Sequence, residues 1–252
     1  MILVTGATGN VGAEVVQALG RAGEPVRALV RRPADVPAEQ VVGDLDDPDS
    51  LAPALDGVRG VFLLPGHRDM PGLLDRMRRA GVERVVLLSS LATVATDTRN
   101  VLSEYMIGSE TAVRESGLAW TFLRPNAFMS NALRWLPQLR AGDVVRDAFG
   151  TVPVASVDPY DIAAVAVRAL LDPGHEERVH PLSGPEPLLP AQRLAVLPRS
   201  SAATCASTPS RTRRAGPTWP RRACRSRTSR RSSASTETAP STSPRSTRPS
   251  SR

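Results

Sequence analysis

Three glycines near the amino end have the type and spacing of a turn that binds phosphate. Gly6, Gly9 and Gly12 follow an apolar run at 1–4 and precede a helix-like run at 13–19. Gly6 allows a tight exit from a strand, Gly9 lets the main chain approach a diphosphate, and Gly12 lets the helix pack closely on the sheet. The free N–H groups and the positive dipole end of that helix would face the anion. Glycine-rich turns also serve as plain connections, but the place between strand and helix favours dinucleotide binding by Gly6, Thr8, Gly9, Asn10 and Val11.

Two arginines indicate which dinucleotide is bound. Val26–Val30 is predicted to be the second strand, and the residue at its end normally faces the adenosine ribose. An acid there would accept a hydrogen bond from a 2′-hydroxyl, whereas arginine fits a 2′-phosphate. Arg31 and Arg32 therefore favour NADPH over NADH, and the alternative is a solvated pair before Pro33.

Further ligand contacts are expected at the ends of the other parallel strands, because ligands bind at the carboxyl ends of such strands. Asp44 and Leu45 would lie near the adenine, and Leu64 and Pro65 near the nicotinamide ribose. Ser89 would lie beside the cofactor or merely cap its strand. The four acids within 44–49 suggest a metal ion, but capping of the helix that begins near residue 51 explains them better, so no metal site is predicted.

The elements that position these residues alternate between strand and helix. Strands are predicted at 40–42, 60–65, 83–90 and 118–123, and helices at 70–80, 100–116 and 159–171. Continuous apolar strands indicate burial on both faces of a parallel sheet. We therefore predict an α/β fold with a doubly wound, Rossmann-like parallel sheet. Asp158 and Pro159 are predicted to be the N-cap and the first residue of the last helix.

Composition divides the chain near residue 198. All 32 basic residues are arginine, and 13 of them lie in 199–252 beside a single acid, Glu237, so the body has 19 basic and 24 acidic residues. From Arg199 onward there is no Val, Ile, Leu, Met or Phe, so this segment cannot bury enough apolar surface to offset the entropy of ordering it. We predict a nucleotide-binding body at 1–198, with a small, incomplete substrate lobe at about 126–198, and a disordered tail at 199–252.

We interpret the tail as a frameshifted reading of a normal C-terminus, through mutation or sequencing error, rather than as a nucleic-acid-binding arm. Leu197–Thr208 can be back-translated with G/C-rich codons. Reading from the third base then gives Ala-Glu-Val-Leu-Gly-Arg-Asp-Leu-Arg-Phe-Asp, which has the pattern of an amphipathic helix, a glycine stop and a strand.

The expected location is the cytoplasm. Both cysteines lie in the tail, which argues against a disulfide framework or a metal site, and a cysteine-free body fits a reducing compartment. No signal peptide is recognised, and no apolar run approaches the roughly 18 residues of a membrane span. We expect no nucleic-acid or membrane partner.

Several longer motifs carry a family resemblance. They are TGATGNVG at 5–12, LVRRP at 29–33, GDLDDP at 43–48, VVLLSS at 85–90, SGLAWTFLRPNAFMSN at 116–131, VDPYDIAAVA at 157–166 and LSGPEPLLP at 182–190. With these motifs the chain resembles the NmrA-like, atypical branch of the short-chain dehydrogenase/reductase superfamily, over Met1 to about Leu197. The resemblance implies an NAD(P)-binding protein but specifies no substrate.

Many members of this superfamily use a Y-x-x-x-K pair, in which the lysine lowers the pKa of the tyrosine so that the phenol can exchange a proton with the substrate. This chain contains no lysine. The pair would fall at Leu102 and Met106. Tyr105 lies nearby, but Ser109 stands four residues later. The catalytic residues therefore stay unassigned.

The resemblance leaves two other polar candidates. Glu110 matches an acidic position that this branch often keeps, and the alternative is a solvated helix carboxylate. His67 is the only histidine near the expected nicotinamide, where it would be a proton donor or simply an exposed loop residue.

The residues after the strand at 118–123 should form the substrate side. An apolar pocket over the nicotinamide could be lined by Phe128, Met129, Asn131 and Trp135. Alternatively, Phe128 and Trp135 are seven residues apart and form one helix face that packs into the core.

Two functions remain open. The first is an NADPH-dependent reductase whose small-molecule substrate, such as a quinone or an azo compound, needs little acid catalysis. The second is a non-catalytic, NADP(H)-sensing regulator of the NmrA type that contacts a partner protein. The missing lysine favours the regulator. Arginine in place of every lysine indicates a G/C-rich bacterial gene, which favours a generic reductase, and we place the enzyme slightly ahead.

Overall fold

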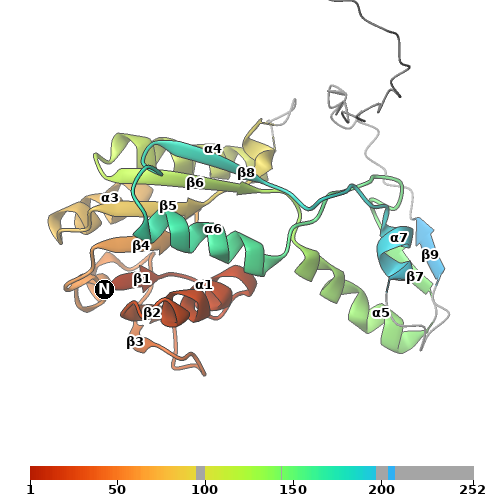
Figure 1. Ribbon diagram of the computed structural model, residues 1–252, viewed down its shortest axis with the longest axis horizontal. Coiled ribbons are helices and arrows are strands. Elements are labelled where there is room, and N and C mark those ends of the chain that lie inside the picture. Colours follow the sequence, from red (N-terminus) through yellow and green to blue (C-terminus); the bar gives the residue numbers. More distant parts are fainter. Residues whose placement is uncertain (95–99, 143, 197–203, 208–252) are drawn as a thin grey trace, which may run out of the picture. The chain divides into compact units, whose positions relative to one another are not determined.

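Seven parallel strands form the central sheet of the protein. The computed structural model describes residues 1–94, 100–142, 144–196 and 204–207. The sheet order is β3-β2-β1-β4-β5-β6-β8 (Figure 1). In chain order the strands are β1 (Ile2–Val4), β2 (Val26–Val30), β3 (Glu39–Val42), β4 (Gly60–Leu63), β5 (Arg84–Leu88), β6 (Ala119–Pro125) and β8 (Arg178–Leu182). The order changes direction between β1 and β4, which confirms the predicted doubly wound fold and marks the edge where ligands bind in such sheets.

Helices cover both faces of the sheet. One face packs on α1 (Asn10–Arg21) and α6 (Pro159–Leu171), and the other on α2 (Ala52–Leu55), α3 (Met70–Arg79) and α4 (Val101–Glu115). Single-turn 3-10 helices run from Pro48 to Leu51 and from Leu91 to Val94. Side chains of a strand alternate between the two cores, so Ile2 and Val4 join the first and Leu3 the second. This two-sided burial explains the unbroken apolar strands.

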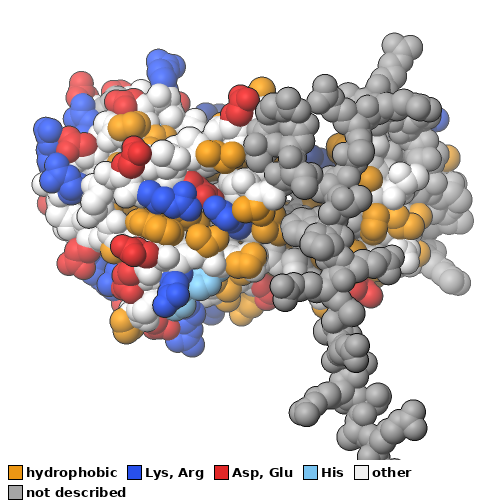
Figure 2. All heavy atoms as spheres, turned by 90° about the horizontal axis from the view of Figure 1, so that it is seen from above, with side chains coloured by type: hydrophobic (Ala, Val, Ile, Leu, Met, Phe, Trp, Pro, Cys, Tyr) orange, Lys and Arg blue, Asp and Glu red, His pale blue; other side chains and the backbone are white. Residues whose placement is uncertain are grey.

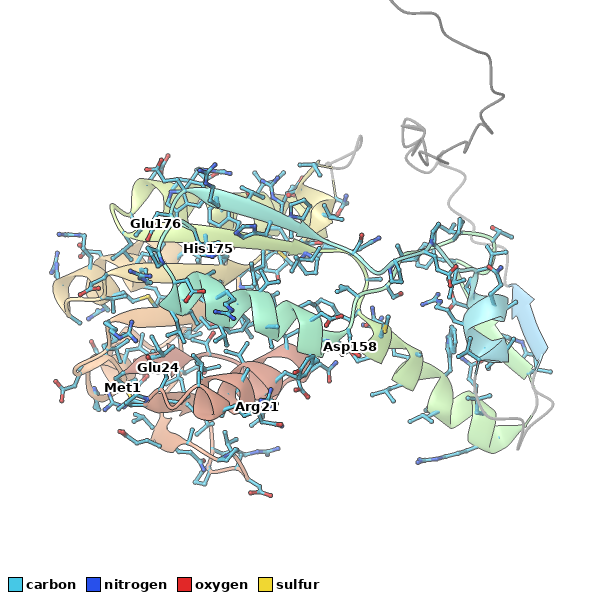
Figure 3. All side chains as sticks on the ribbon, viewed as in Figure 1. Met1, Arg21, Glu24, Asp158, His175 and Glu176 are labelled. Atoms are coloured by element: carbon cyan, nitrogen blue, oxygen red, sulfur yellow. The ribbon has the colours of Figure 1, made fainter. Side chains whose placement is uncertain are left out.

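Polar caps fix where the helices begin. Asp158 precedes Pro159, and its carboxylate accepts a hydrogen bond from the Tyr160 N–H at 2.9 Å, as predicted. Asp69 caps α3 in the same way, through the Gly72 N–H at 2.9 Å. Asp158 lies at the end of the sheet opposite Met1, which is the end where the parallel strands terminate (Figure 3).

A smaller lobe follows β6. It consists of a 3-10 helix (Met129–Trp135), α5 (Leu136–Ala141), β7 (Val144–Asp147), α7 (Pro190–Ala195) and β9 (Thr204–Ser207). Its core is formed by Trp135, Val145 and Leu194. Bridges between Phe128 and Val157 and between Val154 and Leu188 tie its chain segments together.

Four residues of the segment predicted to lack structure, Thr204–Ser207, form strand β9 instead. This strand pairs in parallel with β7, from Val144 opposite Thr204 to Asp147 opposite Ser207. Main-chain pairing of this kind needs no apolar side chain, which is why composition alone missed it. The predicted tail otherwise lies outside the described residues.

The surface of the sheet part carries charges of both signs, interspersed over the face shown in Figure 2. Among the described helices, none combines the length and apolar character that a membrane crossing requires.

Candidate functional site

The turn between β1 and α1 can be built only with glycine at two of its positions. Gly6 has a φ of +63°, and a Cβ there would overlap the side chain of Leu64. A Cβ on Gly12 would overlap the carbonyl oxygen of Gly6. The turn is closed by a hydrogen bond from the Gly9 N–H to the Gly6 carbonyl at 2.8 Å. These contacts support the separate roles predicted for Gly6 and Gly12.

The start of α1 fits a diphosphate. Gly9 is the N-cap and has no side chain, so no side chain occupies the N–H groups of the first turn. Such N–H groups, together with the helix dipole, bind phosphate. Val11 is buried and can contribute only its main chain, whereas Thr8 and Asn10 are exposed at the turn. The Asn10 amide also donates to the Ser130 hydroxyl at 3.0 Å, which links this turn to the smaller lobe.

Arg31 and Arg32 share a pocket of about 550 Å³ with Thr8 of the glycine-rich turn. Both arginines are exposed, and neither is in an ion pair with another described residue. Val30 and Ala34 complete the lining. The geometry thus places the two arginines and the glycine-rich turn around one pocket, and the assignment of the pair to a 2′-phosphate stays a prediction.

The acids at 44–49 accept hydrogen bonds from the main chain. Asp44 accepts from the Asp46 N–H at 3.0 Å, Asp46 from the Arg68 N–H at 2.8 Å, and Asp47 caps the 3-10 helix before α2. Leu45 packs against the core on the α2 side of the sheet. Within the described residues, no three His, Cys, Asp or Glu side chains are grouped as metal ligands. Asp47 therefore caps a helix start, as predicted for this stretch, whereas Asp44 and Asp46 bond to loop N–H groups and Asp49 lies 3.7 Å from Arg76.

Thr5 positions the predicted ribose contacts, and the sequence reasoning did not assign it this role. Its buried hydroxyl donates to the Phe62 carbonyl at 3.0 Å and accepts from the Leu64 N–H at 2.9 Å. The hydroxyl thereby holds the 64–65 segment beside Gly6. The available signal was a hydroxyl residue placed directly after an apolar strand.

Ser89, Glu110 and Arg124 form a buried network at the carboxyl ends of β5 and β6. Glu110 is only 2% exposed, so the alternative of a solvated helix carboxylate is wrong. It accepts from the Ser89 hydroxyl at 2.5 Å and from Arg124 Nε at 2.9 Å and Nη2 at 2.6 Å. Burial raises the pKa of Glu110, but the hydrogen bonds from Arg124 and Ser89 and the charges of Arg124 and Arg114 outweigh burial and lower it. Ser89 thus bonds to Glu110 rather than capping its strand, and the sequence reasoning missed Arg124.

Tyr105 lacks the surroundings of an activated phenol. Its ring lies against Gly66, where a Cβ would overlap it, and partial burial raises its pKa. The residue four positions later, Ser109, donates to the Tyr105 carbonyl at 2.9 Å and accepts from the Gly66 N–H at 3.0 Å. Leu102 is exposed. The missing tyrosine–lysine pair is therefore not replaced by another arrangement around Tyr105.

His67 lies in the same surface pocket as Tyr105. Its Nδ1 is 3.8 Å from Asp46, and its buried Nε2 has no partner among the described residues. Burial lowers the pKa of His67 more than the Asp46 carboxylate raises it, so the ring is neutral near pH 7. The suggested role as a proton donor stays a prediction.

Phe128 and Trp135 do not share a pocket or a helix face. Phe128 packs against the core beside α1 and α6, whereas Trp135 belongs to the core of the smaller lobe. The intervening residues form a 3-10 helix, whose period does not place positions seven apart on one face. Asn131 and Trp135 do line one pocket, together with three arginines, whereas Met129 is exposed. Both predicted interpretations of the 128–135 segment were thus wrong in part.

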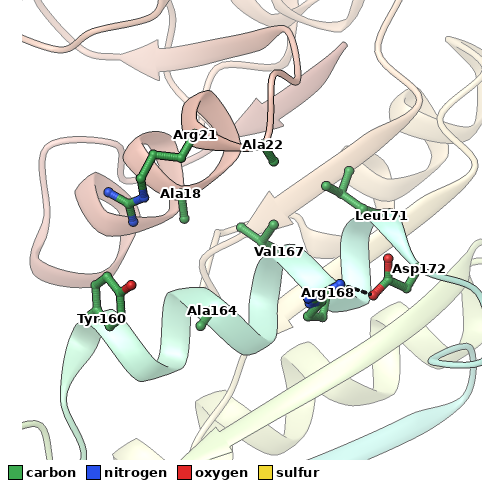
Figure 4. Close-up of a pocket in the computed structure, with 9 residues that line it drawn as sticks. All are labelled: Ala18, Arg21, Ala22, Tyr160, Ala164, Val167, Arg168, Leu171 and Asp172. Atoms are coloured by element: carbon green, nitrogen blue, oxygen red, sulfur yellow. Dashed lines mark hydrogen bonds and ion pairs between the residues drawn. The ribbon is translucent and has the colours of Figure 1, made fainter.

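A groove between α1 and α6 is a separate feature (Figure 4). The Arg21 guanidinium lies 5.6 Å from the centre of the Tyr160 ring, and Arg168 pairs with Asp172 at 3.1 Å. Its charged groups are thus engaged with each other or with a ring. The groove includes none of the residues predicted to bind the nucleotide.

Comparison with known proteins supports the binding of a nicotinamide nucleotide. Residues 6–173 match a family described as NAD(P)H-binding. The chain is 45% identical over 207 residues to a (4-alkanoyl-5-oxo-2,5-dihydrofuran-3-yl)methyl phosphate reductase of Streptomyces griseus. The matched region covers 79% of this chain and 73% of the relative. It is 37% identical over 208 residues to an NAD(P)H azoreductase of Xenophilus azovorans, covering 78% and 72%.

A solved structure agrees with these relatives. The NADPH-dependent quinone oxidoreductase of Escherichia coli in complex with NADPH superposes with a TM-score of 0.70 at 27% identity, over 83% of this chain and 78% of that one. The resemblance inferred from the sequence motifs is confirmed. The chain belongs to the NAD(P)H-binding family, on the NmrA-like branch of the short-chain dehydrogenases/reductases.

Proposed function

We propose that the protein is an NADPH-dependent reductase of a small acceptor whose conjugated system takes up a hydride readily. The reductases among its relatives support this most directly, and the makeup of α4 indicates what kind of acceptor is reduced. Leu102 and Met106 occupy the positions expected for tyrosine and lysine, and the sequence has no lysine. Because α4 supplies no phenol with a lowered pKa, we expect the acceptor itself to stabilise the negative charge that develops on it.

The residues of the nucleotide crevice fit this cofactor. The N–H groups of Asn10 and Val11 would hold the diphosphate, and Arg31 and Arg32 the 2′-phosphate. Thr5 fixes Leu64 at the edge of the crevice. When bound, the reduced nicotinamide supplies a hydride.

The substrates named for the relatives suggest the class of acceptor. A 4-alkanoyl-5-oxo-2,5-dihydrofuran has a ring double bond between C3 and C4, and C4 carries both carbonyl groups. Hydride addition at C3 breaks this double bond and leaves the electron pair on C4, shared with two carbonyl oxygens. Water can protonate such an enolate without help from a tyrosine. We therefore infer that the acceptor is a conjugated alkene activated by two carbonyl groups. Quinones and azo compounds would be alternative acceptors.

The test begins with fluorescence titration of the protein with NADPH and NADH. A 4-alkanoyl-5-oxo-2,5-dihydrofuran phosphate, a benzoquinone and an azo dye are then added, and loss of reduced nicotinamide is followed by absorbance. We expect oxidation of NADPH with at least the first acceptor, and Tyr105→Phe should keep kcat within about twofold because Tyr105 has no acid role. A general acid contributes roughly 100-fold or more, so a loss of that size in Tyr105→Phe would contradict the proposed chemistry.

The sequence also allowed a non-catalytic NADP(H)-sensing regulator. That function predicts nucleotide binding without turnover. Tight binding of NADPH combined with no oxidation by any of the three acceptors would therefore favour the sensor over the reductase.

A further inference from the structure

Three arginines meet in a pocket of the smaller lobe, apart from the pair that faces the nucleotide crevice. The pocket has a volume of about 530 Å³ and is lined by Arg134, Arg146 and Arg193. These residues come from the 3-10 helix after β6, from β7 and from α7. The fold thus brings together three guanidinium groups that are far apart in the sequence.

Arg193 is held in place without a carboxylate. Its guanidinium lies 5.2 Å from the centre of the Trp135 ring, and the Trp135 Nε1 donates to Asp147 at 3.1 Å, which fixes the ring. Arg193 Nη1 is 3.5 Å from the Ser156 hydroxyl, and its buried Nε has no partner among the described residues. A buried guanidinium N–H without an acceptor is costly, and an anion in the pocket would satisfy it.

Arg146 is positioned through its main chain. The Gln138 side chain accepts from the Arg146 N–H at 2.7 Å and donates to the Arg146 carbonyl at 3.1 Å. Its guanidinium and that of Arg134 form no ion pair with another described residue. Both side chains are therefore available to a ligand.

The pocket carries a net positive charge. Among the described residues that line it, the one carboxylate is Asp147, which already accepts from Trp135 Nε1 at 3.1 Å and from the Phe149 N–H at 2.8 Å. Both donors are uncharged, so Asp147 offsets only one of the three positive charges. The remaining field favours an anion.

Apolar side chains share the same pocket. Phe149 is 66% exposed and Val152 is 46% exposed, although both are large and hydrophobic. A pocket with guanidinium groups and exposed apolar side chains fits a ligand that has both an anionic group and a hydrocarbon chain.

The pocket adjoins the nucleotide turn along the chain. Asn131 lines the pocket, and its neighbour Ser130 accepts a hydrogen bond from Asn10 of that turn. A ligand in this pocket would therefore be close to the segment that touches the first turn of α1.

We propose that Arg134, Arg146 and Arg193 bind a phosphate monoester group on the acceptor, and that Phe149 and Val152 contact its hydrocarbon chain. This inference rests on the proposed reductase function, because it assigns the pocket to that reaction's substrate.

The test compares Arg134→Gln and Arg146→Gln with Arg140→Gln, an exposed arginine of α5 that does not line the pocket. The probes are a 4-alkanoyl-5-oxo-2,5-dihydrofuran methyl phosphate and the corresponding alcohol. Loss of one charge-assisted hydrogen bond should raise KM for the phosphate about tenfold in each pocket variant. KM for the alcohol and KM for NADPH should stay unchanged, and Arg140→Gln should match the wild type for all three.

Calorimetric binding of the phosphate to the NADPH-saturated protein provides a readout that needs no turnover. Binding that is weakened by Arg146→Gln but followed by no reduction would support the pocket and contradict the reductase function. If the phosphate probe and the alcohol probe were reduced with equal KM, the proposed reductase function would stand, but the proposal that this pocket binds the phosphate group would be contradicted. A raised KM for NADPH in the variants would also overturn it, because the arginines would then belong to the nucleotide site.

Discussion

Arg124 holds Glu110 with two hydrogen bonds, Nε to Oε1 at 2.9 Å and Nη2 to Oε2 at 2.6 Å. This pair joins α4 to the end of β6, and the Ser89 hydroxyl adds the end of β5 at 2.5 Å. The carboxyl ends of two neighbouring strands are thus fixed by one carboxylate. Arg114, which lies over Phe122 at 4.8 Å, adds a second cation beside Glu110 at 3.4 Å.

Replacing Glu110 with glutamine should destabilise the protein by about 3 kcal/mol, because the largely buried Arg124 charge loses its partner. Glu104→Gln, on the exposed face of the same helix, should have little effect. Chemical denaturation of both variants checks this. Equal stability of the two variants would show that the Glu110 pair contributes nothing beyond a surface carboxylate.

The Glu110–Arg124 pair also predicts that the protein loses stability at low pH. The pKa of Glu110 is lowered in the folded protein, so the unfolded chain takes up its proton at a higher pH than the folded protein. The stabilisation by Glu110 is therefore complete above the ordinary glutamate pKa of about 4.5 and is lost as pH falls through the lower folded value. Unfolding free energies measured from pH 7 to pH 3 should fall less steeply in Glu110→Gln than in the wild type, and parallel curves would rule out this source of acid sensitivity.

Replacing both Arg31 and Arg32 with alanine should weaken NADPH binding by about tenfold or more, because charge-assisted hydrogen bonds to the 2′-phosphate are lost. NADH has no such phosphate, so its affinity should not change. Fluorescence titration with both nucleotides measures the difference, and Arg140→Ala, which removes one exposed arginine outside the crevice, is the control. If the ratio of the NADPH and NADH affinities did not change, the assignment of Arg31 and Arg32 to the nucleotide site would be contradicted.

Gly12→Ala should abolish nucleotide binding and lower stability by about 1–3 kcal/mol, because its Cβ would overlap the Gly6 carbonyl and force the turn open. Gly20→Ala is the matched control on the same helix, since a Cβ there meets nothing within 4 Å. That control should gain up to about 1 kcal/mol from helix propensity. Thermal melting with and without NADPH measures both effects, and a normal NADPH-induced shift in Gly12→Ala would contradict the proposed cradle.

Replacing 197–208 with the alternative reading frame should raise the melting temperature. That frame places Leu-Arg-Phe on the residues that form β9. The Leu and the Phe would then lie on the same face of the strand. The partner strand β7 contains the fully buried Val145, so this face can extend an apolar core. A scrambled insert of equal composition is the control. The frameshift hypothesis fails if the gene's second frame encodes no amphipathic, Leu/Val-containing stretch after Leu197.

The sheet could be predicted because its signals are local. Apolar runs such as Val26–Val30, the glycine spacing at 6–12 and the Asp158-Pro159 cap each lie within a few residues of sequence, and all appear in the structure. The smaller lobe could not be predicted in the same way. Its strands β7 and β9 are four residues each and pair across about sixty positions of the chain.

The site shows the same division. Arg31 and Arg32 follow a recognisable strand, so their place at its carboxyl end, in one pocket with Thr8, was predictable. The partner of Glu110 was not, because Arg124 lies on another element and sequence spacing carries no information about which carboxylate it meets. Arg134, Arg146 and Arg193 are brought together only by tertiary packing around Trp135.

The hydrogen bond from Asn10 to Ser130 has a kinetic consequence. A diphosphate bound at the first turn of α1 would fix Asn10 and, through it, Ser130 of the smaller lobe, where we propose that the acceptor binds. Nucleotide association should therefore precede productive acceptor association, so that steady-state patterns follow an ordered scheme in which the oxidised nucleotide leaves last.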